Sequence, residues 1–284
     1  MDIRTAVIHV QPGARHQDDA ARAMLAGLVR HGIKVRLAQY DVPEVADLTV
    51  VWSWRQQRVV SESLENQIPI LVMERGHLPP RRNWISCGFN GMLRRGVYAV
   101  PAPGNDRLER YFAQHIKEWV RREGYALLID QVAGEGSTTG PFSHSWTEDV
   151  IAVLSALGHN IRYRRHPKAL EWKDNWVPPD LEISSASLIE DFEKAAICVT
   201  FNSSVAVEAV VYGVPAVSFD VDSMAWEVTS HNLGEPPLFC DRQAWLERLS
   251  WVQWSMEELS SGVAWDALRS LVPTLWSPAN RGIV

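Results

Sequence analysis

The segment from residue 196 to residue 219 constrains the fold most, because it reads as a complete strand–helix–strand unit. Residues 197–200 form a short apolar run of the kind that a buried parallel strand needs. Residues at helical spacing follow until Gly213, which predicts the end of the helix, and residues 214–219 begin a second strand. This arrangement predicts an α/β fold with a parallel sheet.

The turn inside this unit carries Asn202, Ser203 and Ser204, whose side-chain oxygens can cap a helix. A strand that leads directly into such a helix start places backbone N–H groups and hydroxyls at the carboxyl edge of the sheet. That edge is where α/β folds bind phosphate groups. The alternative is an ordinary crossover whose serines only cap the helix.

Strands and helices alternate along the rest of the chain in two series. We expect strands at residues 3–10, 33–39, 48–54 and 68–73, then at 125–130, 161–165 and 181–183, and helices at 18–31, 58–66, 146–157, 187–195, 242–254 and 256–270. The sequence therefore predicts two Rossmann-like domains facing across a cleft, with a helical C-terminal tail. The expected boundaries are a first Rossmann-like domain at 1–104, a connecting helix at 105–122, a second Rossmann-like domain at 123–241, and helices at 242–284 that pack back on the first domain.

Composition excludes several classes of protein. With 46% hydrophobic and 22% charged residues among 284, the chain is typical of soluble globular proteins. The formal charge of −6 argues against coating nucleic acid by bulk electrostatics, although a local basic groove stays open. No apolar run reaches the roughly 18 residues of a membrane span, and the first residues read as a strand and not as a signal peptide. Three cysteines without metal or redox spacing indicate a reduced cytoplasmic protein.

Three loops follow strands of the second series, at residues 131–140, 164–168 and 202–204. They should meet at one sheet edge and offer glycine N–H groups, hydroxyls, a guanidinium and an imidazole, a set that suits a diphosphate or a nucleotide monophosphate. Glu208, one helical turn beyond Ser204, is placed to accept hydrogen bonds from ribose hydroxyls, or it is a solvent-facing helix residue.

His166 precedes Pro167, which favours an extended backbone at the end of its strand. Arg165-His166-Pro167, followed by Thr200-Phe-Asn-Ser-Ser-Val-Ala-Val-Glu208-Ala-Val-Val-Tyr-Gly213-Val-Pro215, resembles the donor half of GT-B glycosyltransferases, in particular the capsule-polysaccharide and Kdo-transferase-like group. The resemblance covers about residues 125–220. It implies that Arg165, His166, Ser203, Ser204 and Glu208 hold a donor nucleotide. A structural role for His166 is the alternative.

The full expected donor site combines these positions with the loop residues. It comprises Gln131, Gly134, Ser137, Thr138, Arg165, His166, Pro167, Lys168, Asn202, Ser203, Ser204 and Glu208. The expected co-substrate is a nucleotide sugar, with no cofactor and no essential metal. The positive charge of Arg165 and Lys168 would stabilise the leaving group.

Residues 74–91 are rich in polar and ionisable groups at the carboxyl end of a predicted strand. Glu74-Arg75-Gly76-His77-Leu78 and the following Trp84-x-Ser86-x-Gly88-Phe89-Asn90-Gly91 resemble a segment of bacteriophage-encoded glycosyltransferases. That group is linked to sugar transfer onto hydroxymethylated pyrimidines in phage DNA. The resemblance implies such a DNA acceptor, double-stranded DNA as a partner, and the host cytoplasm as the location. A solvated loop is the alternative for this segment.

The general base is expected in this first domain. Glu74 is the candidate, because it ends a predicted strand beside Arg75 and His77; Asp18, Asp19, His77 and Asp130 are the alternatives. The expected acceptor-binding residues are Arg75, His77, Arg81 and Trp84. Basic clusters at 75/81/82, 94/95 and 162/164/165 would support DNA. A capsule or other surface glycan as acceptor, a nucleotide-sugar epimerase, and a protein that only binds nucleotides are the competing interpretations.

Overall fold

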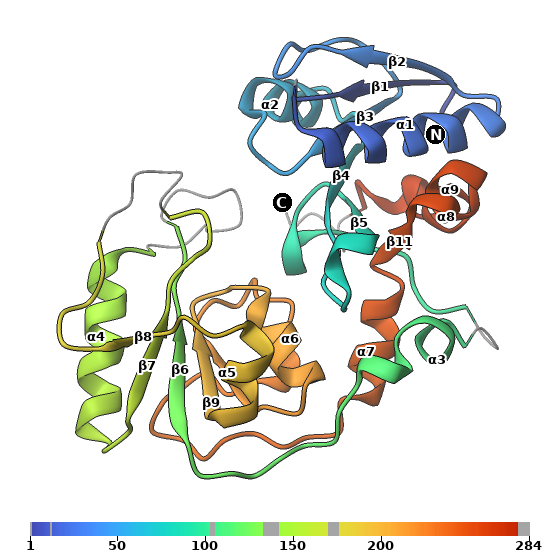
Figure 1. Ribbon diagram of the computed structural model, residues 1–284. Helices are drawn as coiled ribbons and strands as arrows, with labels where there is room; N and C mark the ends of the chain where they lie inside the picture. Colours follow the sequence, from blue (N-terminus) through green and yellow to red (C-terminus); the bar gives the residue numbers. More distant parts are fainter. Residues whose placement is uncertain (1, 12, 103–105, 133–141, 170–175, 278–284) are drawn as a thin grey trace. The chain divides into compact units, whose positions relative to one another are not determined.

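The computed structural model describes residues 2–11, 13–102, 106–132, 142–169 and 176–277 (Figure 1). The chain divides into two compact units. Unit 1 comprises Met1–Arg110 and Leu246–Val284, and unit 2 comprises Tyr111–Trp245. Each unit is built around a mainly or wholly parallel sheet with helices packed against it, which confirms the predicted α/β class with two Rossmann-like parts.

Unit 1 contains a six-stranded sheet in the order β11-β5-β4-β3-β1-β2 (Figure 1). Its strands are β1 (Thr5–His9), β2 (Lys34–Ala38), β3 (Leu48–Trp52), β4 (Ile70–Arg75), β5 (Trp84–Phe89) and β11 (Gln253–Ser255). The first four strands are mutually parallel, whereas β5 runs antiparallel to β4 and β11 runs antiparallel to β5. A chain segment from the C-terminal region thus completes the sheet that the N-terminal region begins.

The helices of unit 1 are α1 (Arg15–Arg30), α2 (Gln57–Glu65), α8 (Met256–Ser261) and α9 (Val263–Leu268), with short helices η1 (Arg81–Asn83), η2 (Leu93–Arg95) and η5 (Arg269–Thr274). Helices α1 and α8 approach each other so closely that a Cβ built on Gly27 would lie 2.0 Å from the carbonyl oxygen of Leu259. The apolar face of α1, including Met24 and Leu28, packs in one core with the sheet and with Trp265. The C-terminal segment therefore contributes to the main core of unit 1.

Residues 74–91 do not form the predicted loop. Strand β4 continues through Glu74 to Arg75, and residues 84–89 form a strand whose six residues are all buried. The reason is that β5 lies between β4 and β11, so its backbone groups pair on both sides. Strand β11 was also missed, because residues 242–254 were expected to be one helix. That stretch is α7 (Gln243–Ser250) followed by β11.

Unit 2 contains a five-stranded parallel sheet in the order β10-β9-β6-β7-β8. Its strands are β6 (Tyr125–Ile129), β7 (Ile161–Arg164), β8 (Glu182–Ile183), β9 (Ala195–Thr200) and β10 (Ala216–Ser218), and its helices are α4 (His144–Ala156), α5 (Leu188–Lys194) and α6 (Val205–Val211), with η3 (Ala113–His115) and η4 (Trp226–Val228). Val150 and Leu154 of α4 pack against Leu128 and Val199 of the sheet.

The predicted unit at residues 196–219 is confirmed as β9–α6–β10. Gly213 adopts a left-handed φ of 81° and ends the helix, as expected, and its N–H donates to the carbonyl of Val210 at 3.1 Å. A Cβ at this position would lie 2.0 Å from the carbonyl oxygen of Glu118. Glycine is therefore required both by the backbone conformation and by the neighbouring chain.

The helix expected at residues 105–122 is wrong. In the part of this segment that the structure describes, α3 (Arg107–Tyr111) and η3 are short, and the chain then runs non-helically to β6. The N–H groups of Lys117 and Val120 donate to the carbonyls of Val211 and Gly213, at 2.8 and 2.9 Å. Because the backbone pairs with the end of α6, it cannot also form its own helical hydrogen bonds. In the described ranges, no helix is both long and apolar enough to cross a membrane.

Candidate functional site

The ends of three strands meet at the carboxyl edge of the unit 2 sheet. Gln131 follows β6 and Asn202 follows β9. The Gln131 Nε2 donates to Asn202 Oδ1 at 2.7 Å, and the Asn202 N–H donates to Gln131 Oε1 at 2.8 Å. His166 follows β7, and its N–H donates to Asp130 Oδ2 at 3.1 Å. The described parts of the three loops therefore lie together, as the sequence predicted; Gly134, Ser137 and Thr138 lie outside the described residues.

Gln131 and Asn202 are buried, at 4% and 2% exposure, and their side chains bind each other. The Asn202 amide also donates to Asp220 Oδ2 at 2.7 Å. These contacts fix the ends of β6, β9 and β10 relative to one another. A direct contact of either amide with a donor nucleotide stays a prediction, since the contacts in the structure are internal.

The tautomer of His166 follows from its local contacts. The N–H of Lys168 donates to His166 Nδ1 at 3.2 Å, so Nδ1 acts as an acceptor and the neutral ring carries its hydrogen on Nε2. His166 is half-buried, while Pro167 and Lys168 are exposed. The strand end thus carries an imidazole and, two residues later, an exposed lysine, residue types that suit an anionic oxygen.

The start of α6 differs from the predicted cap. Ser204 occupies the N-cap position, but its φ of −59° and ψ of −12° are helical, and its side chain makes no capping hydrogen bond. Ser203 Oγ instead accepts from the N–H of Val205 at 3.3 Å. Both serines and Glu208 are half-buried. Burial and, after it, the charge of Glu208 raise the pKa of Cys198 in β9.

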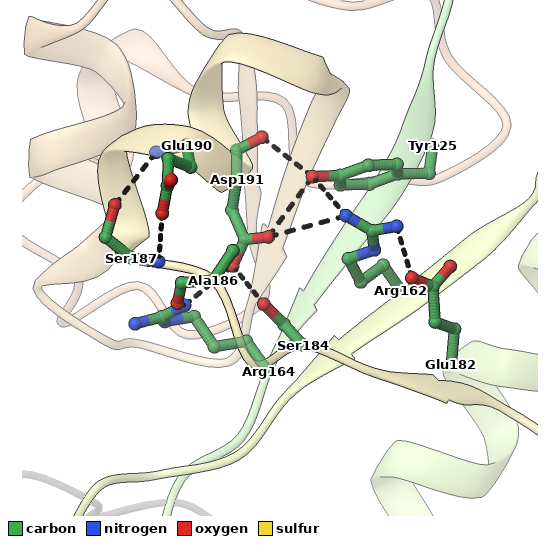
Figure 2. A network of polar contacts seen from close by, with 9 residues as sticks. All are labelled: Tyr125, Arg162, Arg164, Glu182, Ser184, Ala186, Ser187, Glu190 and Asp191. Atoms are coloured by element: carbon green, nitrogen blue, oxygen red, sulfur yellow. Dashed lines mark hydrogen bonds and ion pairs between the residues drawn. The ribbon is translucent and has the colours of Figure 1, made fainter.

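Two arginines of β7 belong to a polar network around the buried Asp191 on unit 2 (Figure 2). Arg164 donates to Asp191 Oδ2 and to the Ala186 carbonyl, both at 2.7 Å, and Asp191 is fully buried. Arg162 pairs with Glu182 and donates to the hydroxyl of Tyr125 at 3.2 Å. The network places two cations opposite two carboxylates. Arg162 and Arg164 therefore stabilise the fold, which weakens the case for a DNA groove based on them.

Glu74, the predicted base, lies within β4 opposite Ser86 of β5 and is half-buried. Its negative charge is one of the causes, after burial, that raise the pKa of the buried Tyr98 hydroxyl. Of the alternative bases, Asp18 pairs with Arg22 at 3.2 Å on the surface of α1. The catalytic role of Glu74 stays a prediction.

The four predicted acceptor-binding residues have different surroundings. Arg75 is exposed. Arg81 Nε donates to the Gly76 carbonyl at 2.8 Å. His77 is 5% exposed, its N–H donates to Gln253 Oε1 at 2.6 Å, and burial, aided by the charge of Arg81, lowers its pKa to about 3. Trp84 is 7% exposed inside the sheet. Of the four, Arg75 is thus the best placed to meet a large ligand.

The sequence interpretation did not consider two histidines at the carboxyl edge of the unit 1 sheet. His16, at the start of α1, packs edge-on against Trp52 at the end of β3, with ring centroids 5.7 Å apart. Burial, then the charge of Arg75, lowers the pKa of His16. His9 ends β1, is 2% exposed, and has a pKa lowered by burial. The sequence signal for His9 is a histidine at the end of a predicted strand.

The chain contains one Asp-x-Asp sequence, Asp220-Val221-Asp222, directly after β10. Asp220 accepts from the Asn202 side chain and from the N–H of Asp222, so its two oxygens are engaged within the protein. Among the residues that the structure describes, no three His, Cys, Asp or Glu side chains gather as metal ligands would. Nothing in the geometry of this segment favours a metal role for it.

The two Rossmann-like units define the GT-B fold, and the comparison with solved structures agrees. The chain is similar to the β-Kdo 2,4-transferase of KpsC from Thermosulfurimonas dismutans, with a TM-score of 0.54 and 13% identity over 88% of this chain and 91% of that one. It is also similar to the β-Kdo 2,7-transferase of the same protein, with a TM-score of 0.51 and 13% identity over 91% and 98%. No protein-family profile and no curated protein matches the sequence. At this identity the likeness establishes the fold.

Proposed function

We propose that the protein is a glycosyltransferase that moves a sugar from a nucleotide-sugar donor to a hydroxyl acceptor, without an essential metal. The observation that supports this most is the convergence of the β6, β7 and β9 strand ends, joined by the Gln131–Asn202 and Asp130–His166 hydrogen bonds. His166 and Lys168 follow β7 at this edge, and Ser203 and Ser204 follow β9. Such a set of donors suits the phosphate of a nucleotide.

The transfer would require three contributions from this chain. The Nε2–H of His166 and the ammonium of Lys168 would neutralise charge on the leaving nucleotide. Glu208 would accept hydrogen bonds from the ribose. Glu74 would remove the proton from the acceptor hydroxyl, which then attacks the anomeric carbon as the bond to the phosphate oxygen breaks.

For the acceptor, we favour a glycan hydroxyl over a hydroxymethylated pyrimidine in phage DNA. Arg162 and Arg164 are engaged with Glu182 and Asp191, and His77 and Trp84 are buried, so four residues that supported DNA binding serve the fold instead. The similar solved structures are named as Kdo transferases. Arg75 and the exposed Arg82 remain as cations for an acidic glycan or for DNA phosphates.

One assay tests the proposal and separates the alternatives. The protein is incubated with a panel of nucleotide sugars and either an acidic oligosaccharide or hydroxymethylated duplex DNA, and the products are identified by mass spectrometry after digestion. Glycosylated oligosaccharide with released nucleotide is the expected result. Glycosylated nucleosides would instead establish the DNA acceptor. Conversion of the nucleotide sugar without any acceptor would indicate an epimerase, and nucleotide binding without a product would indicate a binding protein.

A further inference from the structure

Asp130 is a buried carboxylate with one oxygen that no described residue satisfies. The residue is 3% exposed and directly follows β6 at the carboxyl edge of the unit 2 sheet. Oδ2 accepts from the N–H of His166 at 3.1 Å, and Oδ1 takes no hydrogen bond from any residue in the described part of the chain. An acceptor that is buried in this way costs free energy until a donor reaches it.

The surroundings of Asp130 make this unpartnered oxygen unusual. The nearby cations of β7 are engaged elsewhere: Arg164 binds Asp191, and Arg162 binds Glu182. No ion pair joins Asp130 to a lysine, arginine or histidine of the described residues. Other buried side chains at the same edge, Gln131 and Asn202, complete their hydrogen bonds with each other. Asp130 is thus a buried carboxylate at this edge with one oxygen that no described residue satisfies, which points to a ligand group as the partner.

The chemistry of a carboxylate limits what that group can be. An ionised carboxylate only accepts hydrogen bonds, and it repels phosphate oxygens. The phosphate of a nucleotide would therefore lie on the side of His166 and Lys168. In a nucleotide sugar, the groups bonded directly to the phosphates are the ribose and the transferred sugar, and both carry hydroxyls. Because Asp130 holds the backbone of His166, its free oxygen lies beside the predicted phosphate position.

We infer that Asp130 Oδ1 accepts a hydrogen bond from a sugar hydroxyl of the bound nucleotide-sugar donor, and that Asp130 is a donor-recognition residue. This inference rests on the proposed donor site. It gives Asp130 two functions: Oδ2 positions the His166 strand end, and Oδ1 accepts a hydrogen bond from the ligand. The hydroxyl belongs either to the ribose or to the transferred sugar, and the same chemistry serves both.

The Asp130→Asn variant separates these two functions. The amide oxygen can still accept from the N–H of His166, while an NH₂ group replaces the free acceptor. The matched control is Asp149→Asn, which makes the same change at an exposed position of α4. Because Asp130→Asn keeps the size and shape of the side chain and its contact with the His166 N–H, the melting temperature of the free protein should not fall.

Binding is measured by calorimetry with three kinds of ligand: ribonucleotides (CMP, UMP, UDP and GDP), their 2′,3′-dideoxy counterparts, and the corresponding nucleotide sugars. Asp130→Asn should lower the affinity for the ligand by roughly 10- to 100-fold, the effect of losing a charge-assisted hydrogen bond. A loss on ribonucleotides that disappears with the dideoxy ligands assigns the hydroxyl to the ribose. A loss confined to nucleotide sugars assigns it to the transferred sugar.

Two other outcomes overturn the inference, and they differ from each other. If the unaltered protein binds its nucleotide and Asp130→Asn binds it equally well, Asp130 is structural and the proposed function stands. A lower melting temperature together with unchanged affinity leads to the same conclusion. If the unaltered protein binds no nucleotide or nucleotide sugar of the panel, both the proposed function and the role of Asp130 are rejected.

Discussion

Arg164 donates a 2.7 Å hydrogen bond to a carboxylate oxygen of Asp191, a residue with no exposed surface. The same oxygen accepts from the hydroxyl of Ser184 at 2.6 Å (Figure 2). The buried Asp191 carboxylate depends on Arg164 and Ser184, because a buried charge without such partners is costly. The pair therefore joins β7 to α5 and fixes one face of the unit 2 sheet.

Replacing Asp191 with Asn should destabilise the protein by about 3–5 kcal/mol, because the guanidinium of Arg164 would lose its counterion in a partly buried site. The free energy of unfolding in urea measures the effect. Asp149→Asn, an exposed change on the same unit, should shift it by less than about 0.5 kcal/mol. Equal stability of the two variants would show that the network contributes little.

Replacing Glu74 with Gln should lower sugar transfer by about 10²- to 10⁴-fold if this carboxylate is the base, and should leave donor binding unchanged. Glu62→Gln is the control, since Glu62 is exposed on α2 of the same unit. Turnover is measured by nucleotide release and binding by calorimetry. Unaltered turnover would show that Glu74 is not the base, and His16 would then be the next residue to replace.

The stability of the protein should fall as the pH is lowered from about 6.5 towards 3, in part because of His77. Burial lowers the pKa of this histidine to about 3, against a usual value of 6.5. Below 6.5 the unfolded chain binds a proton that the folded chain does not, so acid favours unfolding. His77→Gln should reduce the slope of stability against pH in this interval.

Replacing Gly27 with Ala should destabilise unit 1 by about 1–3 kcal/mol, although alanine is the better helix former. The new Cβ would lie 2.0 Å from the Leu259 carbonyl oxygen, and neither backbone can move without disturbing the packing of α1 on α8. Thermal unfolding measures the change. Gly234→Ala serves as the control, because its Cβ would have only one neighbour, at 3.6 Å. If both variants melt at the same temperature, α1 and α8 can separate freely.

Local patterns in the sequence predicted most of the parallel strands and the helices that follow them. The unit at residues 196–219 is an example, since its apolar strand, helical spacing and Gly213 all concern neighbouring residues. The convergence of the β6, β7 and β9 loops also followed, because carboxyl ends of parallel strands share one edge.

Features that depend on distant partners were missed. Residues 84–89 form a strand that pairs with β4 on one side and, on the other, with β11, which lies more than 160 residues later. Residues 116–120 are not helical because α6 offers them carbonyl groups. The pairing of Arg164 with Asp191 and the unpartnered oxygen of Asp130 likewise depend on which side chains meet in three dimensions. No spacing within a single segment carries that information.

The position of β11 at the edge of the unit 1 sheet has a consequence for synthesis on the ribosome. Strand β5 emerges early, but its partner, Gln253–Ser255, and the helix α8 that covers α1 emerge only after all of unit 2 has been translated. Until then β5 has an open edge that can pair with another chain. We expect nascent or C-terminally truncated chains to aggregate through this edge, and a ribosome that pauses between the two segments to increase the yield of misfolded protein.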